Sequence, residues 1–139
     1  MNNTVYFWPA FTLALLTFSV MIRMLLSRIA QMKALKVHPQ ATATSVQMAA
    51  KLPDSRASDN FRNLFETPVL FYAALLFAHV SQQTSQILIV LAWGYVSLRV
   101  VHSIIQCSYN KVMHRFYVFF ASVWVLLAIW IVLAINLLK

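Results

Sequence analysis

Residues 67–98 read TPVLFYAALLFAHVSQQTSQILIVLAWGYVSL, and no Asp, Glu, Lys or Arg interrupts these 32 positions. A helix needs about 20 apolar residues to cross the hydrocarbon core of a bilayer. The run is therefore too long for one crossing and too short for two complete ones. The polar stretch 81–86 (SQQTSQ) divides it and predicts a turn between two membrane helices, the second of which continues past Leu98 to about Cys107.

Two further runs without charge, 2–22 and 116–138, complete a set of four predicted crossings. A transmembrane β-barrel alternates lipid-facing and lumen-facing residues over short segments, whereas these runs are continuously apolar. The composition agrees, because charged residues make up 10% of the chain against about 25% in a typical soluble domain. We therefore predict an all-α integral membrane four-helix bundle, a single domain over residues 1–139, with spans at about 4–27, 60–80, 87–108 and 115–138.

The distribution of basic residues predicts how the chain is oriented. Residues 1–22 hold no Lys or Arg, which favours a membrane span over a cleavable signal peptide, because such a peptide needs a positive leader. The first and third connections carry the basic residues, Arg28, Lys33, Lys36, Lys51, Arg56, Lys111 and Arg115. Since Lys and Arg concentrate on the cytoplasmic side, both termini are expected on the periplasmic or lumenal side. This bias accounts for the net charge of +8 without a nucleic-acid partner.

Polar residues form a stripe along each of the two middle spans. Span two carries Asp59, Arg62, Asn63 and Glu66, and span three carries Tyr95, Arg99, His102, Gln106 and Tyr109. Within each set the spacing is three or four, which places the members on one face of a helix. Ionisable groups are costly at bilayer depth, so we expect both stripes to face protein or water.

Two interpretations of the stripes stay open. In the first, Glu66 neutralises Arg62 or Arg99 in an ion pair that holds the helices together. In the second, the stripes line a ligand site. The second interpretation is favoured by an excess of bases, since Arg62, Arg99 and Arg115 face Glu66 alone among nearby acids. An unpaired buried cation is costly, and Arg recognises carboxylates in a bidentate manner. A small anionic molecule bound near the cytoplasmic helix ends would fit.

Other catalytic chemistries find little support in the sequence. One glycine does not make a phosphate-binding loop, and no Ser-His-Asp arrangement is visible. The four histidines, at positions 38, 79, 102 and 114, lack metal-ligand spacing, so no metal site is predicted. The single cysteine, Cys107, excludes an intrachain disulfide and is interpreted as a packing residue.

Three motifs in order resemble the MAPEG family, the membrane-associated proteins of eicosanoid and glutathione metabolism. Arg62-Asn63-Leu64-Phe65-Glu66 is similar to the family's Arg-Asn-x-x-Glu element on the second helix. Arg99-Val100-Val101-His102 resembles an Arg-x-x-His element on the third helix of prostaglandin E synthase-like members. Arg115 then lies at the distance of the family's thiol-activating Arg at the start of helix four.

The chain also departs from the family pattern. Gln106 stands where some members have a tyrosine, and Tyr109, one helical turn further, is the candidate to replace it. Phe116 and Phe119 stand where prostaglandin E synthase has polar side chains near the thiol. Arg56-Ala57-Ser58-Asp59-Asn60 is similar to a further Arg-Ala-x-x-Asn element but does not align with the second-helix motif without a gap.

The resemblance implies a homotrimer that binds glutathione between neighbouring subunits, near the cytoplasmic side. Asn63 and Glu66 would contact the tripeptide, Glu66 at its amino group. Arg28, Arg62 and Arg99 would face its carboxylates, with His102 and Tyr109 in the same pocket. Arg115 would hold the sulfur as the thiolate, because a nearby guanidinium favours the anion. The expected second substrate is a lipophilic small molecule, an electrophilic lipid or a hydroperoxide drawn from the bilayer.

Two alternatives to a glutathione transferase or peroxidase remain. One is a non-catalytic member of the same fold that binds a membrane lipid or presents it to a partner. The other is a small four-helix transporter that uses Glu66 for proton coupling, which would require Glu66 to face a central cavity and the sequence to contain an internal repeat. No repeat is visible.

Overall fold

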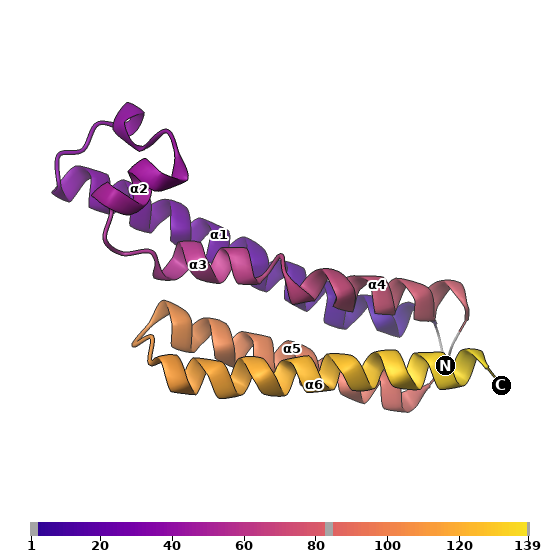
Figure 1. Ribbon diagram of the computed structural model, residues 1–139. Coiled ribbons are helices and arrows are strands. Elements are labelled where there is room, and N and C mark those ends of the chain that lie inside the picture. Colours follow the sequence, from indigo (N-terminus) through magenta and orange to yellow (C-terminus); the bar gives the residue numbers. More distant parts are fainter. Residues whose placement is uncertain (1–2, 83–84, 139) are drawn as a thin grey trace.

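The computed structural model describes residues 3–82 and 85–138 (Figure 1). Gln83 and Thr84, within the predicted turn, and Lys139 lie outside the described residues. Every regular element in the described ranges is a helix, and four apolar helical stretches are long enough to cross a membrane: Thr4–Ala34, Arg56–Val80, Gln86–Cys107 and Val112–Leu137. The prediction of an all-α, multi-pass membrane bundle is confirmed.

The helices form two layers of antiparallel rods (Figure 1). The elements are η1 (Asn3–Tyr6), α1 (Phe7–Ala34), η2 (Pro39–Thr42), α2 (Ser45–Lys51), α3 (Arg56–Asn63), α4 (Thr67–Val80), α5 (Gln86–Cys107) and α6 (Val112–Leu137). α1 lies along α3 and α4 in one layer, and α5 lies along α6 in the other, with α5 also contacting α1 and α3. The start of α1 and the end of α6 lie at the same end of the bundle.

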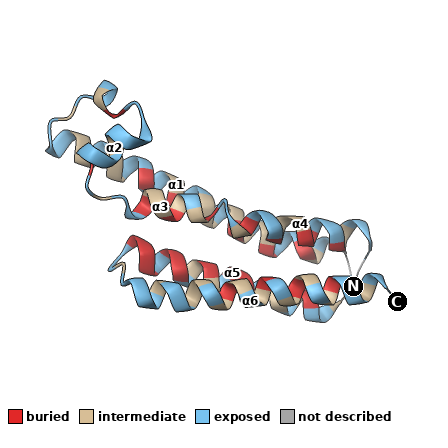
Figure 2. Cartoon of the chain, viewed as in Figure 1, coloured by how far each residue is buried: buried red, intermediate tan, exposed pale blue. Residues whose placement is uncertain are grey.

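A narrow core joins the layers while their outer surfaces stay apolar. Phe71 of α4 is completely buried and stacks on Tyr95 of α5, with ring centroids 4.6 Å apart. Large apolar side chains on the outer faces of α1 and α6, such as Phe18 and Trp124, are exposed, and Figure 2 shows how little of either helix is buried. An exposed surface of this kind fits contact with lipid tails, which are as apolar as these side chains.

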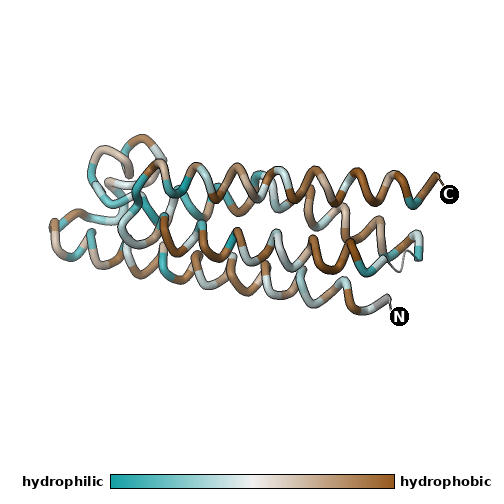
Figure 3. Tube along the Cα trace, turned by 90° about the horizontal axis from the view of Figure 1, so that it is seen from below, coloured by the Kyte–Doolittle hydropathy of each residue, from teal (hydrophilic) through white to brown (hydrophobic). Residues whose placement is uncertain are grey.

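The connection between α1 and α3 is the polar end of the molecule. α1 stops at Ala34, and Lys36 takes a left-handed conformation with φ of 53°, as is common just beyond a helix end. The short helix α2 begins with a capping box between Thr44 and Gln47. Figure 3 shows that hydrophilic residues gather at this end, opposite the marked termini.

The second span is broken into α3 and α4 by residues 64–66. Pro68 lies in the first turn of α4 and has no N–H to donate to the carbonyl of Leu64, so the helix cannot pass through unchanged. A proline inside a membrane span predicts a bend in the helix, and the structure has one between α3 and α4. The prediction that residues 59–66 share one continuous helical face is wrong, because Glu66 has a ψ of −92° and stands at the N-cap of α4.

Candidate functional site

The polar stripe of α5 is turned into the protein, as the sequence predicts, for four of its five members. Tyr95, Arg99, His102 and Gln106 are all at most 2% exposed. Tyr109 lies beyond the end of α5 and is 58% exposed, where its hydroxyl is 3.2 Å from Nδ1 of His114. α5 ends at Cys107, so Tyr109 does not continue the buried stripe.

Arg99 forms hydrogen bonds with residues on both sides of the break between α3 and α4. Its Nη2 donates to the carbonyl oxygen of Asn63 at 3.0 Å and to Oγ1 of Thr67 at 2.5 Å. The break frees backbone carbonyls that must find partners within a membrane, and the guanidinium supplies a donor to one of them. The bend predicted from Pro68 is thus stabilised by a cation from the neighbouring helix.

Arg99 forms no ion pair with a carboxylate among the described residues, and Glu66 exerts only a weak electrostatic attraction on it from a greater distance. The one ion pair between described side chains is Arg56 with Asp54. Nε and Nη1 of Arg99 are buried without a hydrogen-bond partner in the described part of the chain. The guanidinium carbon lies 5.7 Å and 5.1 Å from the ring centroids of Tyr95 and Phe119. Cation–π contacts of this kind offset part of the burial cost, but the core keeps a net positive charge.

A pocket of about 190 Å³ opens beside this cation, between α3, α5 and α6. It is lined by Asn63, His102, Val112, Arg115, Phe116 and Phe119. Phe119 belongs both to the pocket and to the surroundings of Arg99, and its ring centroid is 5.8 Å from that of His102. Three of the residues that the sequence singled out therefore meet in one hollow, with the charge of Arg99 behind it.

Arg115 and Asn63 of this pocket each form a hydrogen bond with a neutral partner. Arg115 donates from Nη1 to Oδ1 of Asn110 at 2.8 Å, and Asn63 donates from Nδ2 to Oε1 of Gln106 at 3.1 Å. A neutral acceptor fixes the direction of the Arg115 guanidinium without cancelling its charge. The pocket is consequently electropositive, and it can stabilise an anion that enters it.

The other predicted site residues lie elsewhere in the single chain. Arg28 and Arg62 line a separate pocket of about 230 Å³ between the end of α1, α2 and α3, where Nη2 of Arg28 donates to Oγ of Ser58 at 2.9 Å. Glu66 is exposed and lines neither pocket. Five of the eight predicted site residues thus line two separate pockets, rather than one shared hollow. The other three, Arg99, Glu66 and Tyr109, line neither pocket.

Buried polar residues that are not among the predicted site residues connect the elements around the site. Asn60 is completely buried, donates from Nδ2 to Sγ of Cys107 at 3.3 Å and accepts from Oγ of Ser103 at 3.3 Å. Asn60 directly follows Asp59 within the range of the span-two stripe, and a search for all polar residues in the span would have included it. Among the described residues no group of His, Cys, Asp or Glu is arranged to hold a metal ion.

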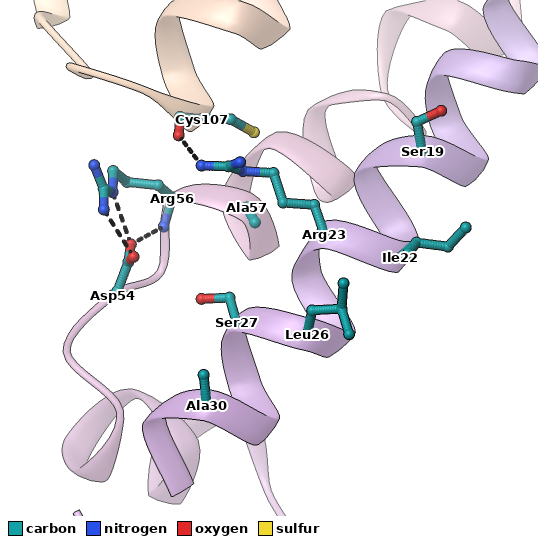
Figure 4. Close-up of a pocket in the computed structure, with 10 residues that line it drawn as sticks. All are labelled: Ser19, Ile22, Arg23, Leu26, Ser27, Ala30, Asp54, Arg56, Ala57 and Cys107. Carbon is teal, nitrogen blue, oxygen red and sulfur yellow. Dashed lines mark hydrogen bonds and ion pairs between the residues drawn. The ribbon is translucent and has the colours of Figure 1, made fainter. Parts of the chain in front are cut away.

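Arg23 is the other residue that the sequence analysis missed. It lies inside the predicted first span, where a charged residue is itself a sign of function. Together with Arg56, Asp54 and Cys107 it lines a pocket of about 500 Å³ between α1, the start of α3 and the end of α5 (Figure 4). This pocket is larger than the two that contain the predicted residues.

The comparison with protein families agrees with the motifs and the four-span architecture. The model of the MAPEG family matches residues 6–135 of the 139-residue chain. No curated protein and no solved structure matches the chain. The family match takes in all four spans and both polar stripes, and the protein therefore belongs to the MAPEG family.

Proposed function

We propose that the protein is an integral membrane glutathione-dependent transferase or peroxidase that acts on a lipophilic substrate. The observation that carries this proposal is the electropositive pocket of Asn63, His102 and Arg115, next to Arg99, which forms no ion pair with a carboxylate among the described residues. Glutathione brings two carboxylates and a thiol that becomes anionic, and so supplies the negative charge that the protein lacks at this place. Membership of a family associated with glutathione supports the same ligand.

In this proposal Arg115 holds the glutathione sulfur as the thiolate. The guanidinium is already oriented by Asn110, so little reorganisation is needed when the charge forms. The thiolate attacks an electrophilic carbon and expels a leaving group such as chloride. With a hydroperoxide it attacks the terminal oxygen, an alcohol leaves, and a second glutathione converts the sulfenic acid to the disulfide and water.

The size of the pocket argues for a site completed by a second subunit. A volume of about 190 Å³ is below the range of roughly 300–1,000 Å³ that ligand sites of drug size occupy. The proposed homotrimer would supply the missing wall and place Arg28, Arg62 or Glu66 of a neighbouring subunit against the tripeptide. In this arrangement Arg99 does not contact the ligand and attracts its negative charge electrostatically across Phe119.

The proposed orientation follows from the same basic residues. Arg28 belongs to the last third of α1, Arg62 to α3 and Arg115 to the start of α6, and Figure 1 shows these parts of the helices toward the end that carries α2. From the positive-inside bias we infer that this end faces the cytoplasm. Soluble glutathione would then enter from the cytoplasm, while the lipophilic substrate would arrive through the bilayer. Both termini would lie on the periplasmic or lumenal side.

A second candidate function is a non-catalytic lipid-binding or scaffold member of the family. It is favoured by Phe116 and Phe119, which make one wall of the pocket apolar. Turnover separates the two candidates. Purified protein in lipid nanodiscs, supplied with glutathione, should conjugate a chlorinated aromatic or reduce a lipid hydroperoxide. Tight glutathione binding without turnover of either substrate would favour the non-catalytic function.

Glu66→Gln is expected to weaken glutathione binding about ten- to a hundredfold. Glu66 is proposed to bind the tripeptide's amino group, and a charge-assisted hydrogen bond contributes about 1.5–3 kcal/mol. Isothermal titration of glutathione into wild type and variant measures the change. Because Glu66 is exposed in the single chain, the variant should keep its melting temperature. Unchanged affinity would remove Glu66 from the ligand contacts.

A further inference from the structure

A groove runs along one face of α1 against the end of α5. Its wider part is the pocket of about 500 Å³ around Arg23, Ser27, Asp54 and Arg56. A second hollow of about 310 Å³, lined by residues that include Leu16, Val20 and Ile104, adjoins it. The two share Ser19, Arg23 and Cys107 as lining residues, so they form one continuous surface, here named the α1–α5 groove.

The groove changes from apolar to polar along a single helical face. Leu16, Val20, Arg23 and Ser27 follow one another on α1 at spacings of four, three and four, which places them on one side of the helix. Leu16 and Val20 lie toward the middle of the span, and Ile104 of α5, 60% exposed, faces the same hollow. Arg23 and Ser27 belong to the C-terminal half of α1, the half that leads to the polar end with α2 (Figure 1).

The polar end of the groove is positively charged. Figure 4 shows Arg23 reaching from α1 to the carbonyl oxygen of Cys107, with Arg56 and Asp54 paired beside it. The carboxylate of Asp54 accepts hydrogen bonds from Arg56, whose guanidinium holds the pKa of that carboxyl below its usual value, while Arg23 adds a smaller electrostatic effect. Two guanidinium groups thus meet one carboxylate, and one positive charge is left over.

The contacts within the protein use only part of what Arg23 can donate. Its bond to Cys107 meets a carbonyl at the end of α5, where cations are favourable, but this takes one of the five N–H donors of a guanidinium. Arg23 remains exposed, although it lies within a helix that spans the membrane. Arg23 forms no other hydrogen bond within residues 3–82 and 85–138, so its remaining donors and its charge are available to an anion at the level of the headgroups.

We propose that the α1–α5 groove binds an anionic phospholipid, with its headgroup phosphate at Arg23 and Ser27 and one acyl chain along Leu16, Val20 and Ile104. Basic pockets between membrane helices on the cytoplasmic side are suited to acidic headgroups. The apolar part of the groove favours a lipid over a free phosphate, because a soluble anion would leave Leu16, Val20 and Ile104 uncovered. The groove contains none of the residues proposed to bind glutathione, so this inference is independent of the proposed activity.

Binding of single lipids to the detergent-purified protein tests the inference, with native mass spectrometry as the readout. Phosphatidylglycerol is compared with phosphatidylcholine of the same acyl chains. Three variants are measured beside the wild type. Arg23→Gln removes the charge, Ser19→Trp fills the groove between its two parts and keeps every charge, and Lys51→Gln is a matched control that removes an exposed charge outside the groove.

The wild type and Lys51→Gln are expected to retain phosphatidylglycerol in preference to phosphatidylcholine. Arg23→Gln should bind phosphatidylglycerol roughly five- to tenfold more weakly, the effect of about one basic residue at a membrane surface, and Ser19→Trp should lose it as well. Equal binding of the two lipids by the wild type would overturn the inference. So would unchanged binding by Ser19→Trp, or protection from thermal unfolding by inorganic phosphate that equals the protection by phosphatidylglycerol.

Discussion

Arg115→Ala is expected to abolish the thiolate absorbance of bound glutathione near neutral pH. Without the guanidinium the thiol pKa returns toward its solution value of about 8.5, and only a few per cent of the bound ligand stays ionised at pH 7. Turnover, which requires the thiolate, should fall roughly 10- to 100-fold. Ultraviolet difference spectroscopy of the glutathione complex measures the thiolate directly.

The substitution is also expected to shift the pH dependence of the activity to higher pH. The reactive anion is present above the thiol pKa and is lost as the pH falls through it, so the wild type should keep activity at a lower pH than the variant. Lys111→Ala is the matched control, because it removes an exposed cation just before α6 that does not line the pocket. An unchanged thiolate signal in Arg115→Ala would remove Arg115 from the mechanism.

Arg99→Met is expected to lower the free energy of unfolding by about 2–4 kcal/mol. Methionine approximately fills the volume but leaves the Asn63 carbonyl and the Thr67 hydroxyl without the donor that Arg99 gives them. Unpaired backbone groups cost several kcal/mol in hydrocarbon, and we expect this to exceed the relief from removing a buried cation. Thermal unfolding in detergent measures the change.

Thr67→Val provides the graded comparison for Arg99→Met. It removes one acceptor and keeps the contact of Arg99 with the Asn63 carbonyl, so a loss of about 1 kcal/mol is expected. A melting temperature of Arg99→Met at or above that of the wild type would show that Arg99 does not stabilise the break. Arg99 would then be explained by its charge next to the pocket alone.

Hydropathy was sufficient to predict the membrane helices, but side-chain contacts decided the site. The apolar runs around 67–98 and the polar stretch between them predicted separate helices, and burial of a polar stripe on α5 followed from the cost of charge in lipid. Arg23 escaped notice because a single charge hardly changes the mean hydropathy of a long apolar span. Its position only becomes significant when α1 lies against the end of α5.

The grouping of the site residues was harder to predict because it depends on a local break. Pro68 indicated a bend, but the direction in which Glu66 leaves the helix is set by the backbone angles at residues 64–66. Arg62 and Asn63 are neighbours in sequence but stand about 100° apart around the helix, and they line different pockets. Tyr109 lies beyond the end of α5, where helical spacing no longer determines its position.

Titration of glutathione into the detergent-purified wild-type protein tests the central claim most directly. The claim is that the positive charges of Arg99 and Arg115 are balanced by a bound anionic ligand. The account predicts saturable binding accompanied by a thiolate absorbance band at neutral pH, and weaker binding of S-methylglutathione, which cannot form the anion. No heat of binding and no thiolate band at millimolar glutathione would contradict it.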